Sequence, residues 1–342
     1  MMASKTESTP STSTAKTRTQ IKPHMNQKRL APLPISKSRK RARKITTLFH
    51  RYTQLKEKAT TIDEKNRIDL LIHGIGGQTA YQKASQVSTS YHSTSKWVLG
   101  CLAQNGWLYG VDDSAPKASE IVTDGAKYEP TIARRAKRRD ALLLEIGAIN
   151  TELLDAAEAT IASAHHGMNE TENELQHNSV PKKYRLCVRA IDLHSMHDRI
   201  EEADFLSLPL VQSDSISLSY DVIVCSMVLN CVPTAMKRGA MLLRIVHFLR
   251  PGGIVYITIP KTCLNLSPYL DANRFAELLQ HVGLNVLEHK KETPKVAYFV
   301  CQKAAGLIDG RSKEWQSTMK IRHGRKFRNN FEIVLPDDAT LM

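Results

Sequence analysis

From about residue 141 onward, continuous hydrophobic runs alternate with stretches in which hydrophobic residues recur at helical spacing. Uninterrupted apolar runs are typical of strands covered on both faces, and helical spacing is typical of the crossovers between them. The predicted strands are 141–146, 184–192, 221–226 and 254–260, with a small one at 205–208, and the predicted helices are 151–163, 234–249 and 268–281. The alternation predicts a doubly wound, mostly parallel α/β sheet.

Three later segments compete for the closing hairpin of this sheet, and the sequence does not settle which two of them pair. They are 284–290, 296–302 and 328–335.

The first part of the chain lacks this alternation. Residues 1–36 are rich in Ser, Thr, Pro and Lys and poor in apolar residues, so they cannot offset the entropy of ordering. From 46 to 72, apolar residues return at helical intervals. We therefore expect a disordered basic tail over 1–45, a helical region over 46–135 and the sheet domain over 136–342.

Charge separates the tail from the rest of the chain. The formal net charge is +14, and residues 1–60 hold fifteen lysines and arginines against only Glu7 and Glu57. The densest block is Lys37–Lys44, which has the composition of a nuclear or nucleolar address that also contacts phosphate backbones. A merely solvated charge run is the alternative.

Several classes of protein are disfavoured. The six cysteines (101, 187, 225, 231, 263 and 301) include no Cys-x-x-Cys pair, so they indicate free thiols and no metal site. No apolar run reaches 18 residues, and the N-terminus lacks the apolar core of a signal peptide. We expect no membrane partner.

The candidate binding chemistry lies where the first two strands end. Glu145-Ile146-Gly147 closes the first, and Asp192 closes the second. Ligands of open α/β sheets bind outside the carboxyl ends of the strands, and a glycine lets the backbone approach them closely. Asp192 follows Gly147 by about 45 residues rather than the roughly 20 of a dinucleotide fingerprint, and a loop insertion over about 164–182 explains the excess.

Further motifs add a family resemblance. Gly147, Asp192 and the Pro251-Gly252-Gly253 turn together resemble the Rossmann-like class I methyltransferases, which use S-adenosylmethionine. More specific blocks are similar to the fungal 25S ribosomal RNA adenine-N1 methyltransferase family, whose animal relatives include an S-adenosylmethionine sensor. These blocks are Gly76–Ser85, Ser95–Trp97, Glu201–Phe205 and Tyr220–Pro233. The resemblance covers about 45–335.

The resemblance implies a set of cofactor contacts. Gly147 would border the methionine part of S-adenosylmethionine, and Asp192 would accept hydrogen bonds from the ribose hydroxyls. Asp204 would accept from the adenine amine, and Phe205 would pack on the adenine ring. Ser226 would lie near the methyl group. One departure is that many such enzymes carry two or three glycines after the first strand, whereas this chain has only Gly147.

The catalytic candidates are Ser226, Asn230, Tyr81 and Gln82. Adenine N1 has an in-plane lone pair, so it can attack without a general base. Catalysis then depends on the alignment of N1, the methyl carbon and the sulfur. Because N1 lies on the Watson–Crick edge, the base must be unpaired or flipped out. Asn230 either orients the substrate or only ends a strand, and Tyr81 and Gln82 either face the substrate or pack a helix. The Asn/Asp-Pro-Pro-aromatic turn of many amine methylases is absent after the third long strand.

We therefore expect an enzyme that methylates N1 of an adenine in large-subunit ribosomal RNA, met free or in a preribosome. The basic tail and the run Lys320–Arg328 would provide salt-sensitive phosphate affinity. We expect a monomer in the nucleus and nucleolus. The alternative is a non-catalytic S-adenosylmethionine sensor that binds protein partners, for which a basic tail has no use. A methyltransferase for small molecules or proteins is a third option.

Overall fold

The computed structural model describes residues 39–89, 94–109, 111–112, 138–166, 185–210, 219–287, 293–304 and 313–337. The predicted disordered tail up to residue 38, most of the expected insertion near 164–182 and residues 113–135 of the predicted helical region lie outside the described residues.

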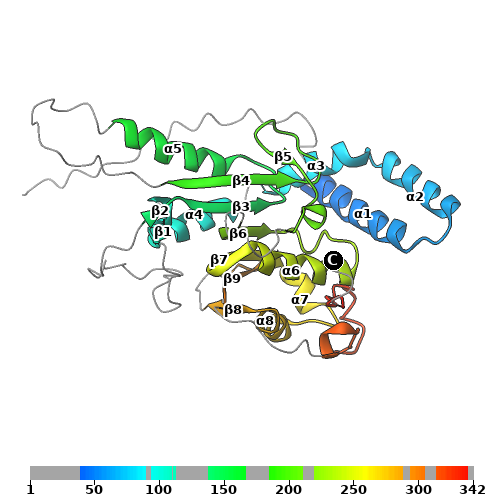
Figure 1. The fold of residues 1–342 in the computed structure, drawn as a ribbon. Coiled ribbons are helices and arrows are strands. Elements are labelled where there is room, and N and C mark those ends of the chain that lie inside the picture. The colour runs from blue at the N-terminus through cyan, green and yellow to red at the C-terminus, as the bar shows by residue number, and fades with distance from the viewer. Residues whose placement is uncertain are drawn as a thin grey trace, which may run out of the picture. The chain divides into compact units, whose positions relative to one another are not determined.

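A seven-stranded sheet forms the centre of the fold, in the order β5-β4-β3-β6-β7-β9-β8 (Figure 1). The strands are β3 (Ala141–Ile146), β4 (Leu186–Asp192), β5 (Glu201–Glu202), β6 (Tyr220–Ser226), β7 (Leu249–Pro260), β8 (Leu284–Leu287) and β9 (Val296–Lys303). Strands β5, β4, β3, β6 and β7 run parallel, whereas β9 is antiparallel to both of its neighbours. This order and direction are those of the Rossmann-like class I methyltransferase fold, so the predicted fold class is confirmed.

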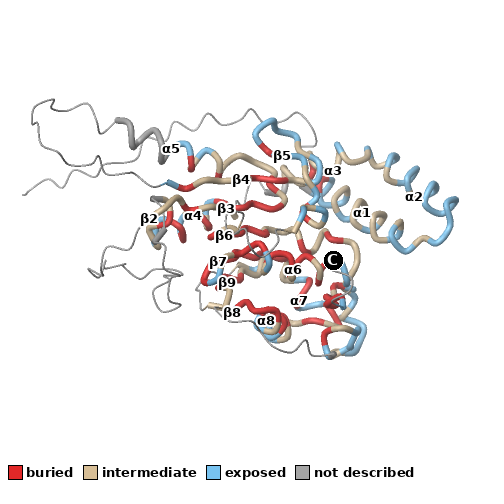
Figure 2. The backbone as a smooth tube through the Cα atoms, in the orientation of Figure 1, coloured by how far each residue is buried: buried red, intermediate tan, exposed pale blue. Residues whose placement is uncertain are grey.

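Helices cover both faces of the sheet because successive residues of its central strands point to opposite sides. Leu144 packs in a cluster with side chains of α6 (Ala235–Phe248) and α8 (Ala272–His281). Leu143 packs in a second cluster with side chains of α4 (Thr94–Gln104) and α5 (Glu152–His166). Figure 2 shows the buried residues gathered along β3, β4, β6 and β7.

Three further helices precede the sheet domain. They are α1 (Arg39–Lys58), α2 (Ile62–Gly74) and α3 (Gly77–Thr89). Helix α1 begins at Arg39, so residues 39–44 of the basic block are helical and the expected boundary at 46 falls too late. The reason is local, because Ala42 is fully buried within that block and gives it an apolar side. Helix α2 buries none of its residues.

Two predicted strands are wrong. Residues 205–207 form a short 3-10 helix, η3 (Phe205–Ser207), which Asp204 caps by accepting a hydrogen bond from the Leu206 amide. Residues 328–335 form no strand, because their apolar side chains are buried against α6 instead. The Val334 amide donates to the Ala235 carbonyl at 3.1 Å. The closing hairpin is therefore β8–β9.

The described chain also contains a small antiparallel pair, β1 (Val111–Asp112) with β2 (Arg138–Arg139). No helix in the described ranges has both the length and the apolarity to cross a membrane. Within the same ranges, no three His, Cys, Asp or Glu side chains come together as a potential metal site.

Candidate active site

The strand order reverses at β3, which has β4 on one side and β6 on the other. Ligands of open α/β folds bind at such a switch point, outside the carboxyl ends of the strands. Gly147 follows the end of β3, while Asp192 and Ser226 are the last residues of β4 and β6. The sheet therefore brings these three predicted site residues to one edge.

Gly147 makes the tightest turn of this edge. The amides of Gly147 and Ala148 both donate to the carbonyl of Ile191, at 2.8 and 2.9 Å. Gly147 has a φ of +72°, and a Cβ added there would lie only 2.5 Å from Cγ2 of Val228, in the loop that follows β6. The missing side chain therefore lets the turn after β3 and the loop after β6 approach each other.

Gly147→Ala should destabilise the fold more than a matched glycine substitution. The left-handed backbone costs a non-glycine residue about 1–2 kcal/mol, and overlap with Val228 should add roughly 1–3 kcal/mol. Gly106 is the control, because its φ is +70° and nothing lies within 4 Å of an added Cβ. Urea unfolding of Gly147→Ala and Gly106→Ala measures the difference, and equal losses would show that Val228 does not constrain this turn.

Glu145 is a buried acid two residues before Gly147. It belongs to β3, its side chain is buried, and its Oε2 has no hydrogen-bond partner among the described residues. Burial, with a smaller contribution from Glu152, raises the pKa of Glu145 to about 8. We did not predict Glu145 as a site residue, although an acid inside the run Leu142–Ile149 was a visible signal.

Asp192 lies half-buried at the tip of β4. Its Oδ1 accepts a hydrogen bond from the His194 amide at 2.9 Å, and its carbonyl accepts from the Ala203 amide at 2.8 Å. Burial raises the pKa of the Asp192 carboxyl, opposed by the His194 amide. The local turn therefore fixes this carboxylate at the edge of the sheet beside the Gly147 turn.

Asp204 and Phe205 have clear roles in folding. Both carboxyl oxygens of Asp204 accept local hydrogen bonds, from the Leu206 amide at 2.9 Å and from the Ser207 hydroxyl at 3.0 Å. The ring of Phe205 is 3 % exposed and packs against Phe248 of α6, with ring centroids 5.6 Å apart. Their adenine contacts stay predictions.

The loop after β6 begins with backbone strain. The Ser226 hydroxyl shares a hydrogen bond of 3.0 Å with the Thr258 hydroxyl of β7, which fixes the strand end. Met227 then has a φ of +60°, the one positive value among the described residues other than glycine. Such a conformation costs about 1–2 kcal/mol and tends to occur at functional sites. Nothing in the sequence signals it.

Helices α1 and α3 contribute side chains to this loop. The Tyr81 hydroxyl lies 3.8 Å from Cys231 Sγ, and the Tyr81 ring stacks on Phe49 with centroids 4.3 Å apart. His50 Nε2 lies 3.5 Å from the same sulfur. Gln82 donates to the carbonyl of His194, next to Asp192. Tyr81 and Gln82 thus pack their helix and also contact the loops after β6 and β4.

Three polar side chains around this loop, His50, Cys231 and Tyr81, are neutral at pH 7. Burial lowers the pKa of His50 to about 4 and raises that of Cys231 to about 11. Burial and the neighbouring Cys231 raise the pKa of Tyr81 further above its ordinary value. Asn230 donates to Cys231 Sγ at 3.3 Å, and its buried Oδ1 has no partner in the described part of the chain.

Solved structures that match this chain have low sequence identity to it. The chain is 14% identical to the N-methyltransferase NodS from Bradyrhizobium japonicum WM9, covering 48% of this chain and 79% of that one with a TM-score of 0.28. It is 14% identical to a putative sarcosine dimethylglycine methyltransferase from Galdieria sulphuraria, covering 62% and 86% with a TM-score of 0.34. At these scores, the strand order carries the fold assignment.

Sequence comparison is more specific. Residues 167–333 match the family model described as 25S rRNA (adenine(2142)-N(1))-methyltransferase, Bmt2. A Saccharomyces cerevisiae relative named 25S rRNA (adenine(2142)-N(1))-methyltransferase is 33% identical over 152 residues, which are 44% of this chain and 43% of that protein. A Schizosaccharomyces pombe relative named 25S rRNA adenine-N(1) methyltransferase is 28% identical over 164 residues, covering 45% and 57%.

The chain thus spans about half the length of the curated relatives it matches. The matched region contains Asp192, Ser226 and Asn230, whereas Gly147 and Tyr81 precede it. Residues 167–333 are therefore similar to the 25S rRNA (adenine(2142)-N(1))-methyltransferase family.

Proposed function

We propose that this protein transfers a methyl group from S-adenosylmethionine to N1 of an adenine in large-subunit ribosomal RNA. The observation that carries the proposal is the buried carboxyl of Glu145, whose Oε2 has no hydrogen-bond partner among the described residues, beside the glycine turn at Gly147 and at the switch point of a class I sheet. The names of the two yeast relatives support the substrate.

The residues at this edge fit the cofactor. Its amino-acid part carries an ammonium group, which the Glu145 carboxyl would bind, and the bare backbone of Gly147 would let that part approach. Asp192 would accept hydrogen bonds from the ribose hydroxyls, as an acid at this position does in dinucleotide folds. When bound, S-adenosylmethionine supplies a methyl group activated by a sulfonium.

The chain's own residues would position the target base. Adenine N1 attacks through its lone pair, so no residue has to remove a proton. This fits the neutral state of Tyr81, Cys231 and His50 beside the loop after β6. The strained turn at Met227 would hold Asn230 and its neighbours in a fixed orientation toward the base.

The wider setting follows from charge and family. We propose that the partner is large-subunit RNA, free or within a preribosome, and that the protein acts as a monomer in the nucleolus. The basic block Lys37–Lys44 supports the localisation. Fluorescence microscopy of the tagged protein with and without that block tests it, and unchanged cytosolic distribution of both forms would contradict it.

The decisive experiment for the reaction uses the full chain, radiolabelled S-adenosylmethionine and unmodified 25S ribosomal RNA, with primer extension to map the product. We expect label in the RNA and an extension stop at one adenine. If calorimetry shows that the cofactor binds but no label enters the RNA, the proposal is wrong and the sensor alternative is favoured. Label in protein instead of RNA would indicate a protein methyltransferase.

A further inference from the structure

A compact group of unpaired cations lies on the segment from Lys320 to Arg328, which we call the basic strap. Its exposed residues include no apolar side chain; they are Lys320, His323, Gly324, Arg325, Lys326 and Arg328. The four lysine and arginine side chains in that set form no ion pair with another described residue. Uncompensated charge of this kind suits a polyanionic ligand.

The basic strap is held in place by its own half-buried arginine, Arg322. The guanidinium of Arg322 donates to the carbonyls of Leu264, Ser267 and Leu270, and it lies 4.8 Å from the centroid of the Phe327 ring. The Ile321 amide donates to the Pro268 carbonyl at 2.8 Å. Arg322 is therefore occupied within the fold, and it fixes the backbone that carries the exposed cations.

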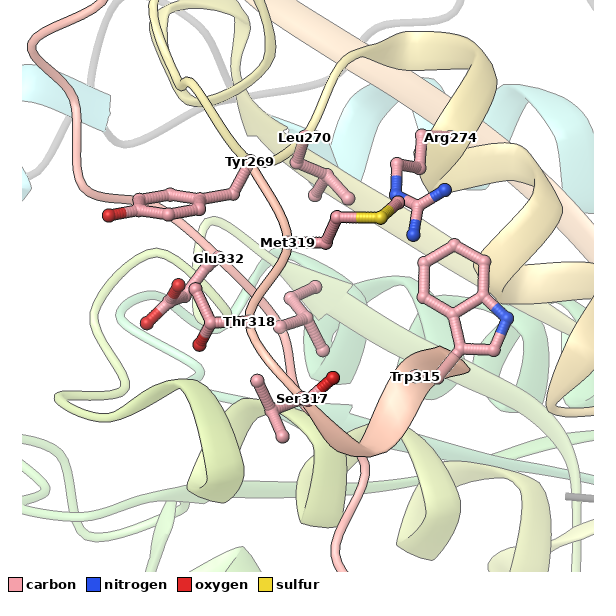
Figure 3. Close-up of a pocket in the computed structure, with 10 residues that line it drawn as sticks. Tyr269, Leu270, Arg274, Trp315, Ser317, Thr318, Met319 and Glu332 are labelled. Carbon is pink, nitrogen blue, oxygen red and sulfur yellow. The ribbon is translucent and has the colours of Figure 1, made fainter. Parts of the chain in front are cut away.

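Neighbouring groups narrow the chemistry of this surface. Lys326 lies on the Phe327 ring at 4.9 Å and Arg322 at 4.8 Å, so the ring is covered and offers little area for base stacking. In the hollow beside Met319, Arg274 lies 4.4 Å from the Trp315 ring and 2.9 Å from Glu314 (Figure 3). Arg274 is thus already neutralised and adds nothing to the strap.

The segment directly after the basic strap contacts elements that are connected to the proposed active site. The helix α7 (Lys261–Asn265) follows β7, whose Thr258 pairs with Ser226 at the tip of β6. Directly after the strap, the Asn329 side chain donates to the Thr262 carbonyl of α7 at 3.1 Å. Three residues further on, the Glu332 carbonyl accepts a hydrogen bond from Arg238 at 2.9 Å, and Arg238 also donates to the Val232 carbonyl of the loop after β6 at 2.9 Å.

We infer that the basic strap binds the phosphate backbone of the substrate RNA and places it over the loop after β6. This inference rests on the proposed function and adds the path by which the RNA reaches the site. The contacts are made by Lys320, Arg325, Lys326 and Arg328 to phosphates, so they orient the strand without reading its sequence. An acidic protein surface is the competing ligand. A protein interface would also require apolar residues on the strap, and the exposed residues of the strap include none.

The test compares two variants with equal loss of charge. Arg325→Gln/Lys326→Gln changes the strap, and Lys65→Gln/Arg67→Gln changes two exposed residues of α2. Filter binding of an unmodified 25S ribosomal RNA transcript is measured from about 50 to 200 mM KCl. The strap variant should bind about tenfold more weakly, with a slope of log K against log salt reduced by about 2, while the α2 variant stays near wild type.

Enzyme assays separate this inference from the proposed function. In the strap variant the KM for RNA should rise about tenfold, with kcat and S-adenosylmethionine affinity unchanged. If wild type methylates RNA but the strap variant keeps its KM and salt slope, the inference fails and the function stands. If wild type binds RNA through the strap without methylating it, the inference stands and the proposed function fails. Polyglutamate serves as a probe for an acidic protein surface. Equal loss of RNA binding in both variants, or a strap variant that loses binding to polyglutamate but not to RNA, would overturn the inference.

Discussion

The substitution Glu145→Gln should raise the free energy of unfolding by about 3–5 kcal/mol more at pH 8.5 than it does at pH 4.5. Burial raises the pKa of Glu145 from its ordinary 4.5 to about 8, so the folded chain keeps a proton that the unfolded chain releases in that interval. The contribution of Glu145 to the stability of the wild type therefore falls as pH rises from about 4.5 to about 8 and levels off above it. Glutamine cannot ionise, so the variant lacks this part of the fall.

Urea unfolding at pH 4.5, 6.5 and 8.5 measures this effect as a difference between the two proteins. Other groups titrate equally in both, so they cancel from the comparison. Glu152→Gln is a useful control, because Glu152 raises the pKa of Glu145 only as the smaller of the two causes and should shift the curve slightly. Parallel stability curves for wild type and Glu145→Gln would show that this carboxyl is not protonated in the folded protein.

Arg238→Ala should lower the free energy of unfolding by about 3–5 kcal/mol and should remove the link between the loop after β6 and the C-terminal segment. Arg238 is 3 % exposed, and its guanidinium donates to the carbonyls of Val232 and Glu332 at 2.9 Å and of Pro233 at 3.4 Å. It also lies 4.9 Å from the Phe331 ring centroid. Truncation leaves three carbonyls without this donor and a cavity between α6 and the C-terminal segment.

The measurement is chemical denaturation followed by methyl transfer on the folded fraction. Arg238→Lys should recover only part of the loss, because an ammonium cannot match the forked donor set of a guanidinium. Lys237→Ala is the exposed neighbour: its pair with Glu57, at 3.1 Å, should contribute no more than about 1 kcal/mol. Equal effects of Arg238→Ala and Lys237→Ala would contradict the role given to Arg238.

The central strands and the edge of the sheet could be predicted because they follow from local pattern. Mostly apolar runs identified β3, β4 and β6. Parallel strands present their carboxyl ends at one edge, so Gly147 and Asp192 had to lie near each other. The same reasoning failed at 328–335. An apolar run shows that a segment is buried, but it does not tell whether a sheet or a helix such as α6 covers it.

Other site features depend on contacts between distant parts of the chain. Tyr81 meets Cys231 across 150 residues, and no local pattern links them. The positive φ of Met227 cannot be predicted from its residue type. Glu145 did carry a signal, since an acid within an apolar run must lose water on folding.

Calorimetric titration of S-adenosylmethionine into wild type, Asp192→Ala and Asp198→Ala tests the proposed cofactor site most directly. Asp198 is the matched control, because its side chain is 92% exposed and it follows β4 in the same loop. Asp192→Ala should weaken binding by about ten- to a hundredfold, from hydrogen bonds worth roughly 1.5–3 kcal/mol, while Asp198→Ala binds like wild type. Equal affinity in all three folded proteins would contradict a cofactor site at the tips of β3 and β4.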